Sequence, residues 1–279
     1  MKLNFESVES IIARVYGQGD DTIDLSNCIF ADISGIVRLV LIAKHRALSG
    51  QPATLIVPRD NNVQTYLERA NAFQELKACC SLSEPVDHLA GNVRNATKNL
   101  VEVRPIEEEG QIRNIVDCFS EHLKSAAVSD EARNAIEKIL YETLQNIPHH
   151  ADPEGKLGAC NGIAALQKYS YELCLAVGDL GVGIRESLTL NPKFPKEIYD
   201  EAKALLAASN EASRHGDRGR GGGLPSVINA LGRLGGACSI RSGSVALKIN
   251  GDSKSIQKIT HFPGTHIDIS VPLNRLEIN

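Results

Sequence analysis

The sequence predicts a two-domain α/β protein. Its 279 residues correspond to about two domains at roughly 150 residues each. From Thr22 to Leu76 strand-like and helix-like segments alternate, which is the order of a small α/β unit. Between Ser81 and Asn99 hydrophobic residues become scarce and Ser, Pro, Gly and Asn more frequent, as in a linker. The predicted domains are therefore residues 1–90 and 91–279.

Composition excludes several classes of protein. Hydrophobic residues make up 42% of the chain and charged residues 23%, which excludes collagen-like and wholly disordered chains. The net charge is −4 without a dense basic stripe, so we predict no direct nucleic-acid binding. The apolar run Ile36–Ala43 is too short to cross a bilayer, and the first residues lack the apolar segment of a signal peptide. We expect a cytoplasmic protein that does not bind membranes.

The seven cysteines favour neither disulfides nor a zinc site. Their number is odd and no Cys-x-x-Cys pair occurs. Buried free thiols are the expectation, and a redox-active Cys79–Cys80 pair is the alternative.

In the first domain, the element order is strand, helix, strand, helix. Strands are predicted at Thr22–Leu25 and Ala53–Val57. Asp32–Gly35 reads as a turn, after which apolar residues recur at helical spacing from Ile36 to Gly50. A second helix is predicted over Asn61–Phe73.

In the second domain, a long amphipathic helix is the most informative element. Ser129 is placed to cap it, and apolar residues then recur every three or four positions to Ile147, where Pro148 is expected to end or kink the helix. The other predicted elements are strands at 101–106, 171–177, 245–249 and 267–271 and helices at 112–123, after Pro195 and after Gly223.

Glu142 and Asn146 are four residues apart in this helix, so their side chains lie on one side of it. An amide oxygen there can bind Mg²⁺, and a carboxylate can hold a nucleophile near a terminal phosphate. An ordinary solvated helix face is the alternative for the pair by itself.

Two glycine motifs follow. Asp179-x-Gly181-x-Gly183 comes at the end of a strand, where bare backbone can approach a flat ligand and a carboxylate can accept a hydrogen bond from an exocyclic amine. A plain tight turn is the alternative reading. Gly219-x-Gly221-Gly222-Gly223-Leu224 opens onto a helix N-terminus, which suits a phosphate, whereas a flexible linker is the alternative.

The connector Arg185–Arg218 between the two motifs is long enough to be a lid. Arg214, His215, Arg218 and Arg220 at its end could screen phosphate charge or simply be solvated. Further on, the Thr265 hydroxyl could bond a purine base or its bound water, although Gly264-Thr265 could equally be a simple turn.

The order of these motifs, from Glu142-x-x-x-Asn146 to Gly264-Thr265, resembles the GHKL ATPase superfamily over about residues 100–273. The resemblance implies a Bergerat fold, with a mixed sheet, helices on one face, an ATP lid, and ATP and Mg²⁺ as ligands. It further implies that Glu142 is the catalytic carboxylate and Asn146 the magnesium ligand. The residues it implies for nucleotide binding are Asn146, His150, Asp179, Gly181, Gly183, Gly219, Gly221, Gly222, Gly223, Leu224 and Thr265. Within the superfamily, the positions of Glu142 and His150 relative to Asn146 are most similar to those in the anti-sigma-factor serine kinases.

The first domain resembles STAS domains through its strand 23–25, the turn Asp32-Ile33-Ser34-Gly35, the helix after it and the strand 53–57. The resemblance implies that Ser34 is a phosphoacceptor for a GHKL serine kinase. The alternative is that Ser34 only caps the helix.

We therefore expect a regulatory protein that binds ATP or ADP with Mg²⁺ and either hydrolyses ATP slowly or acts as a protein-serine kinase. A protein partner is expected at the STAS-like domain, and a homodimer is possible. The alternative is a nucleotide-gated interaction switch without catalysis.

Overall fold

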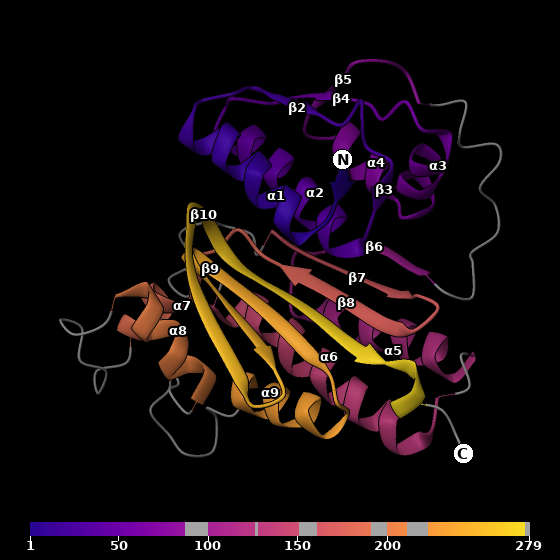
Figure 1. Cartoon of the computed structure of the whole chain (residues 1–279), viewed down its shortest axis with the longest axis vertical. Helices are drawn as coiled ribbons and strands as arrows, with labels where there is room; N and C mark the ends of the chain where they lie inside the picture. Colours follow the sequence, from indigo (N-terminus) through magenta and orange to yellow (C-terminus); the bar gives the residue numbers. More distant parts are fainter. Residues whose placement is uncertain (87–99, 126–127, 151–160, 191–199, 211–222, 277–279) are drawn as a thin grey trace.

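The computed structural model describes residues 1–86, 100–125, 128–150, 161–190, 200–210 and 223–276, without the side chains of residues 125, 149 and 150 (Figure 1). It confirms the predicted α/β fold class. The predicted domain boundary near residue 90 lies outside the described residues.

The N-terminal region (residues 1–86) contains two small parallel sheets, ordered β1–β3 and β2–β4–β5. Its elements are β1 (Lys2–Leu3), α1 (Phe5–Ile12), η1 (Ala13–Gly17), β2 (Thr22–Asp24), β3 (Phe30–Ala31), α2 (Ile33–Leu48), β4 (Thr54–Ile56), α3 (Asn61–Arg69), α4 (Ala72–Lys77) and β5 (Ser81–Leu82). The helix predicted over 61–73 is two helices, because Asn71 adopts a left-handed φ of 60° between them. Helix α1 was not predicted from the sequence.

Asp32, rather than Ser34, caps α2. The Asp32 carboxylate accepts a hydrogen bond of 2.8 Å from the backbone N–H of Gly35, which leaves Ser34 inside the first helical turn. The alternative in which Ser34 serves as the cap is therefore wrong. The hydroxyl of Ser34 instead accepts from Arg38, one turn further on, at 3.4 Å.

The C-terminal region (residues 100–276) is built on one five-stranded sheet, ordered β6–β7–β8–β10–β9. Its elements are β6 (Leu100–Ile106), α5 (Gly110–Ser125), α6 (Asp130–His150), β7 (Gly162–Lys168), β8 (Glu172–Gly178), α7 (Gly183–Thr189), α8 (Glu201–Asn210), α9 (Gly223–Arg233), β9 (Ala237–Asn250), β10 (Ser253–Pro272) and η3 (Leu273–Arg275). Strand β7 was not predicted from the sequence. The expected mixed sheet is wrong, because every described neighbouring pair of strands in this sheet is antiparallel, including the long β9–β10 hairpin.

The long helix α6 continues through Pro148 to His150, so it does not end at the proline, one of the two outcomes expected there. Proline removes one backbone donor, and in the last helical turn this loss is confined to a single hydrogen bond to the preceding turn. At the other end, the Ser129 hydroxyl accepts from the N–H of Ala132 at 3.3 Å, as the predicted cap requires.

Both faces of the large sheet are covered (Figure 1). Helices α5, α6 and α9 lie on one face, and α1 and α2 of the N-terminal region lie on the other. Along β8, Leu173, Leu175 and Val177 join the core beneath α6, whereas Ala176 joins the core shared with α2. Helix α2 is accordingly buried on nearly every side between Ile33 and Ala43, as expected of a helix between two layers.

Small residues bring α2 close to the sheet. A Cβ placed on Gly178 would lie 2.7 Å from the Cδ1 of Leu41 and 2.9 Å from the Nδ1 of His266. The backbone at the end of β8 therefore packs directly against the N-terminal region.

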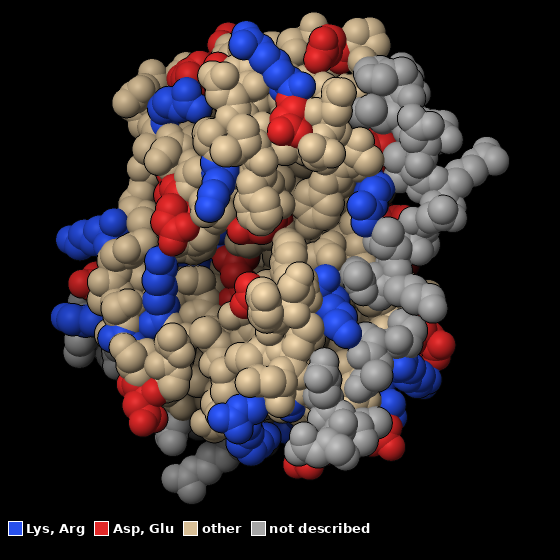
Figure 2. Space-filling model, turned by 45° about the vertical axis from the view of Figure 1, so that its right-hand side comes forward, with Lys and Arg blue, Asp and Glu red and all other residues tan. Residues whose placement is uncertain are grey.

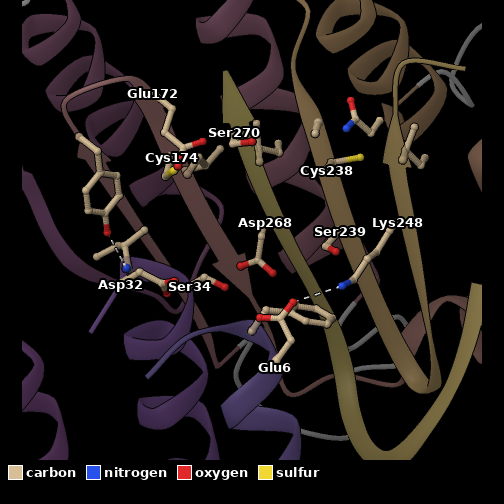
Figure 3. A pocket seen from close by; sticks show the side chains of 18 of the residues that line it. Glu6, Asp32, Ser34, Glu172, Cys174, Cys238, Ser239, Lys248, Asp268 and Ser270 are labelled. Carbon is tan, nitrogen blue, oxygen red and sulfur yellow. Dashed lines mark hydrogen bonds and ion pairs between the residues drawn. The ribbon is translucent and has the colours of Figure 1, made fainter. Parts of the chain in front are cut away.

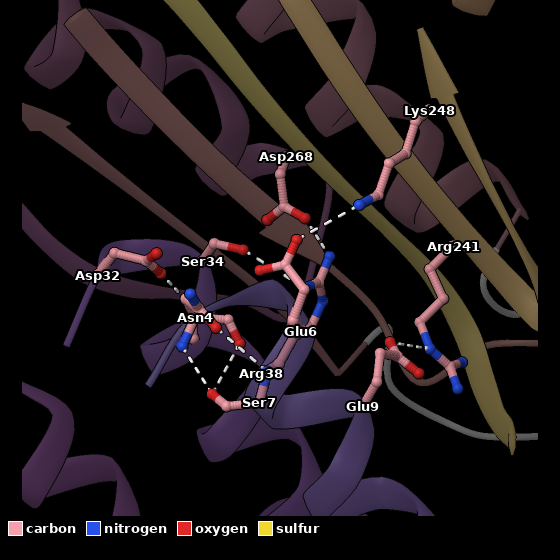
Figure 4. A network of polar contacts seen from close by, with 11 residues as sticks. Asn4, Glu6, Ser7, Glu9, Asp32, Ser34, Arg38, Arg241, Lys248 and Asp268 are labelled. Atoms are coloured by element: carbon pink, nitrogen blue, oxygen red, sulfur yellow. Dashed lines mark hydrogen bonds and ion pairs between the residues drawn. The ribbon is translucent and has the colours of Figure 1, made fainter. Parts of the chain in front are cut away.

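Three ion pairs join this region to the hairpin (Figure 4). Arg38 on α2 pairs with Asp268 on β10, Glu9 with Arg241 at 2.9 Å, and Glu6 with Lys248 at 3.3 Å. Arg38 and Arg241 are 1% and 0% exposed, so these two guanidinium groups lie wholly inside the contact.

The described cysteines, which exclude Cys160, are all free thiols. Cys28, Cys79 and Cys238 are buried, as expected, but Cys118 is exposed on α5. Among the described residues, none of the helices is both long and apolar enough to cross a membrane.

Candidate functional site

Asp179 lies directly after β8, and its side chain is held by two backbone N–H groups. Its Oδ1 accepts hydrogen bonds from Gly181 at 2.8 Å and from Thr265 at 3.3 Å, while its own N–H donates to the carbonyl of Thr265 at 3.0 Å. Asp179 is 6% exposed. Burial raises its pKa to about 7, although the two N–H donors lower it. The fold thus keeps a costly carboxylate in a defined orientation, which is typical of binding sites.

Gly264 makes this arrangement possible. It has a φ of +82°, and a Cβ placed on it would lie 1.9 Å from the carbonyl oxygen of Asp179. The register of β10 against β9 shifts between Phe262 and Thr265, so Gly264 lies at an irregularity inside a long strand. The simple turn considered for Gly264-Thr265 is wrong, and only glycine fits this position.

The glycine loop after Asp179 is fixed from β9. Gly183 has a φ of +78°, and a Cβ on it would lie 2.9 Å from the Oγ of Ser242. The same hydroxyl accepts a 2.8 Å hydrogen bond from the N–H of Ile184, at the start of α7. Ser242 was not predicted as a site residue, because no local motif marks it in the sequence.

Glu142 and Asn146 are half-buried neighbours on α6, and both face the start of α9. A Cβ placed on Gly223 would lie 3.4 Å from the Oδ1 of Asn146 and 3.5 Å from the Oε2 of Glu142. The second glycine cluster therefore ends directly against the predicted catalytic carboxylate and magnesium ligand. Leu224, the next residue, is partly buried against the core of this region.

These residues gather at the end of the sheet that bears Asp179. Ile147, which follows Asn146, would lie 2.6 Å from a Cβ on Gly162 at the start of β7. Ile163, the next residue of β7, pairs with Gly178 at the end of β8. Residues from α6, α9, the β8 loop and β10 thus come together, although they span more than a hundred positions of sequence.

Part of the predicted site lies outside the described residues: Gly219, Gly221, Gly222, Arg214, His215, Arg218, Arg220 and the side chain of His150. In the described part of the predicted lid, α7 and α8 pack against each other through Leu188, Ala204 and Ala208. Glu201 on α8 also accepts a hydrogen bond from the N–H of Ser244 at 2.8 Å. The helical stretch predicted after Pro195 is therefore confirmed by α8.

The chemistry of these groups fits a purine nucleotide with Mg²⁺. Asp179 can accept a hydrogen bond from an exocyclic amine, and the N-terminus of α9 favours an anion beside the amide oxygen of Asn146. In the described residues no three His, Cys, Asp or Glu side chains gather as a metal site. A cation bound at Asn146 would therefore need further ligands, such as phosphate oxygens and water.

Ser34 does not belong to this group of residues. It lies at the start of α2, which covers the other face of the sheet from α6. Its neighbours are Arg38 and the cavity residues described below.

Comparisons with known proteins do not identify the function of this chain. No protein-family model matches the chain, and no curated protein matches it. Among solved structures, the chain is similar to one described as the crystal structure of the SiaB-SiaC complex from Pseudomonas aeruginosa, with 16% identity and a TM-score of 0.35. The alignment covers 68% of this chain and 99% of the other. At this level of similarity, the resemblances to GHKL and STAS proteins stay predictions.

Proposed function

We propose that the chain is a regulatory protein that binds ATP with Mg²⁺ at the end of the sheet beside Asp179, and that it hydrolyses ATP slowly or transfers its phosphate to serine. The contact of Gly223 with Glu142 and Asn146, at the end of the sheet where Asp179 lies, carries this proposal. None of the three motifs to which these residues belong would suffice by itself.

Each residue has a role that follows from its position. Asp179, oriented by two N–H donors, would accept from the exocyclic amine of the base. Gly183 and Gly264 let the chain pack closely around Asp179 and Ser242, and the N-terminus of α9 at Gly223 would face the phosphates. Asn146 would hold Mg²⁺, which supplies positive charge to the phosphate oxygens. Glu142 would take the proton of the attacking water or hydroxyl at its carboxylate.

Glu142→Ala is expected to lower phosphate release at least about 100-fold, because a positioned general base contributes about 10²- to 10⁴-fold. The dissociation constant for Mg-ATP should stay within about threefold, since this carboxylate acts on the nucleophile. Phosphate release and calorimetric titration on the same sample measure both. Glu131→Ala, at an exposed position on the same helix, is the control and should change neither. Unchanged turnover in Glu142→Ala would exclude the general-base role.

A switch without catalysis is the second candidate, and the contact between Gly178 and Leu41 favours it. This contact places the N-terminal region directly behind Asp179, so that nucleotide binding could change how the two regions pack. Tight binding of ATP by the parent protein without phosphate release would identify this second function.

Phosphorylation of Ser34, if it takes place, is expected to occur between two molecules. Ser34 and Glu142 are on elements that cover opposite faces of the sheet, so one molecule cannot bring them together in this arrangement. Mass spectrometry after incubation with Mg-ATP should show a rate per molecule that rises with protein concentration. The parent protein should also modify the Glu142→Ala variant when the two are mixed. A rate independent of concentration would contradict transfer between molecules, and the absence of phosphate would reject Ser34 as the acceptor.

A further inference from the structure

A cavity of about 510 Å³ lies between the N-terminal region and the large sheet. Its walls come from α1, β3 and the start of α2 on one side, and from β8, β9 and β10 on the other (Figure 3). Pockets of a few hundred Å³ suit small molecules. It is on the face of the sheet away from α6 and α9, and is therefore distinct from the proposed nucleotide site.

The polar lining is predominantly acidic. Among the described residues, Lys248 is the only cation that lines the cavity. Four carboxylates line it, each from a different part of the fold: Glu6, Asp32, Glu172 and Asp268. Figure 2 shows acidic side chains at the bottom of a hollow in this face of the molecule.

Two of these carboxylates are already paired. Asp268 pairs with Arg38, and Glu6 with Lys248 at 3.3 Å. Asp32 and Glu172, by contrast, have no ion-pair partner among the described residues. One oxygen of Asp32 caps α2, so its second oxygen is left for another donor.

The surroundings of Asp32 also favour a cationic ligand. The pKa of Asp32 is raised to about 6: burial raises it most and the carboxylates of Asp268 and Glu6 also raise it, whereas the N–H of Gly35 and the guanidinium of Arg38 lower it. The described lining therefore carries more negative than positive charge, and a bound cation would offset the difference.

The apolar part of the lining lies close to these carboxylates. Phe5, Phe30 and Ile33 line the cavity from the N-terminal region, and Phe30 is 44% exposed. The ring of Phe5 already has the Cζ of Arg38 at 4.3 Å and the Nζ of Lys248 at 4.9 Å, which shows that cations pack on aromatic rings at this place. A ligand with a cationic end and an apolar body would use both parts of the lining.

We propose that this cavity is a binding site for a small organic cation, a primary ammonium group carried on an apolar chain or ring. The ammonium group donates to Asp32 and Glu172, and the apolar body packs on Phe30 and Ile33. Such a ligand touches both α2 and β8, so it joins the N-terminal region to the sheet.

Calorimetric titration of the full chain with n-hexylammonium at pH 7.5 tests the proposal. We expect saturable binding, with hexan-1-ol and hexanoate, which have the same chain without the cation, binding at least about tenfold more weakly because they lose a charge-assisted hydrogen bond. Asp32→Asn keeps a side-chain oxygen for the cap but removes the charge, and should weaken binding about tenfold or more. Glu172→Gln should weaken it about threefold or more.

Glu131→Gln, an exposed acid on α6, is the matched control and should bind like the parent. Urea unfolding of each variant shows whether it is folded. If Asp32→Asn does not fold, Glu172→Gln, a substitution at an exposed position, still tests the role of the carboxylates. Three results would each overturn the proposal: equal affinity for the amine, the alcohol and the acid; unchanged affinity in both variants; or no binding of n-hexylammonium up to about 10 mM, beyond the weak-binding range of about 1 mM.

Discussion

Asp179→Asn is expected to weaken nucleotide binding and, in the nucleotide-free protein, to raise the free energy of unfolding. The asparagine keeps an oxygen for the N–H groups of Gly181 and Thr265, so the loop geometry should survive. Losing a charged hydrogen bond to the exocyclic amine costs about 1.5–3 kcal/mol, or about 10- to 100-fold in affinity. Calorimetric titration with ADP and ATP in magnesium buffer measures this loss, and no association of the parent with either nucleotide would refute the nucleotide assignment.

The gain in stability follows from the buried charge. The pKa of Asp179 is raised from 3.8 to about 7 in the folded protein, so the native state retains a proton that the unfolded chain releases. The free energy of unfolding therefore falls as pH rises between about 4 and about 7, and the whole cost is present above that range. The difference in pKa corresponds to roughly 4 kcal/mol, which asparagine avoids because it does not ionise.

Urea unfolding at pH 4.5 and pH 8 checks this prediction without nucleotide. The advantage of Asp179→Asn over the parent should be large at pH 8 and small at pH 4.5. Asp252→Asn, in the exposed turn between β9 and β10, is the control and should show no comparable advantage. A variant less stable than the parent at pH 8 would mean that the carboxylate stabilises the fold.

Arg38→Met is expected to destabilise the protein by about 3–5 kcal/mol at pH 7. The substitution removes the partner of Asp268 while leaving that carboxylate in the contact between α2 and β10. Burial already raises the pKa of Asp268 despite Arg38, so the unpartnered charge should be costly and the loss smaller at lower pH. Urea unfolding of the full chain measures the effect.

The double variant Arg38→Met/Asp268→Leu separates charge from packing. Replacing both members of a buried pair by apolar residues is often neutral or stabilising, so this variant should regain most of the stability lost in Arg38→Met. A double variant at least as unstable as the single one would show that the loss comes from packing, because Arg38 also lies 4.3 Å from the centre of the Phe5 ring.

Several features of the fold can be predicted from the sequence. The alternation of Leu173, Leu175 and Val177 predicted β8, and the apolar repeat up to Ile147 predicted α6, because burial of one face imposes these periods. The stretch 33–43 is buried nearly all round in α2, and a helix that is apolar on almost every side is typical of a position between two layers. The small residues Ala176 and Gly178, which let α2 approach the sheet, are also visible in the sequence.

Other errors had local causes that the pattern does not show. Asn71 breaks a helix through one left-handed residue, and Asp32 takes the capping position two residues ahead of Ser34. The helix break and the cap both depend on backbone angles, which hydrophobic periodicity does not report.

The sequence by itself determined most of the elements, without α1 and β7, and the chemical groups predicted for the candidate site, since period, capping residues and glycine spacing are local properties of the chain. Only the tertiary structure decided that α2 closes the second face of the sheet and that Ser34 lies away from Glu142. It alone decided that Ser242 and Gly264 shape the loop around Asp179 and that four carboxylates enclose a cavity. These features depend on contacts between residues far apart in the chain, and such contacts are selected by packing and burial of the whole molecule.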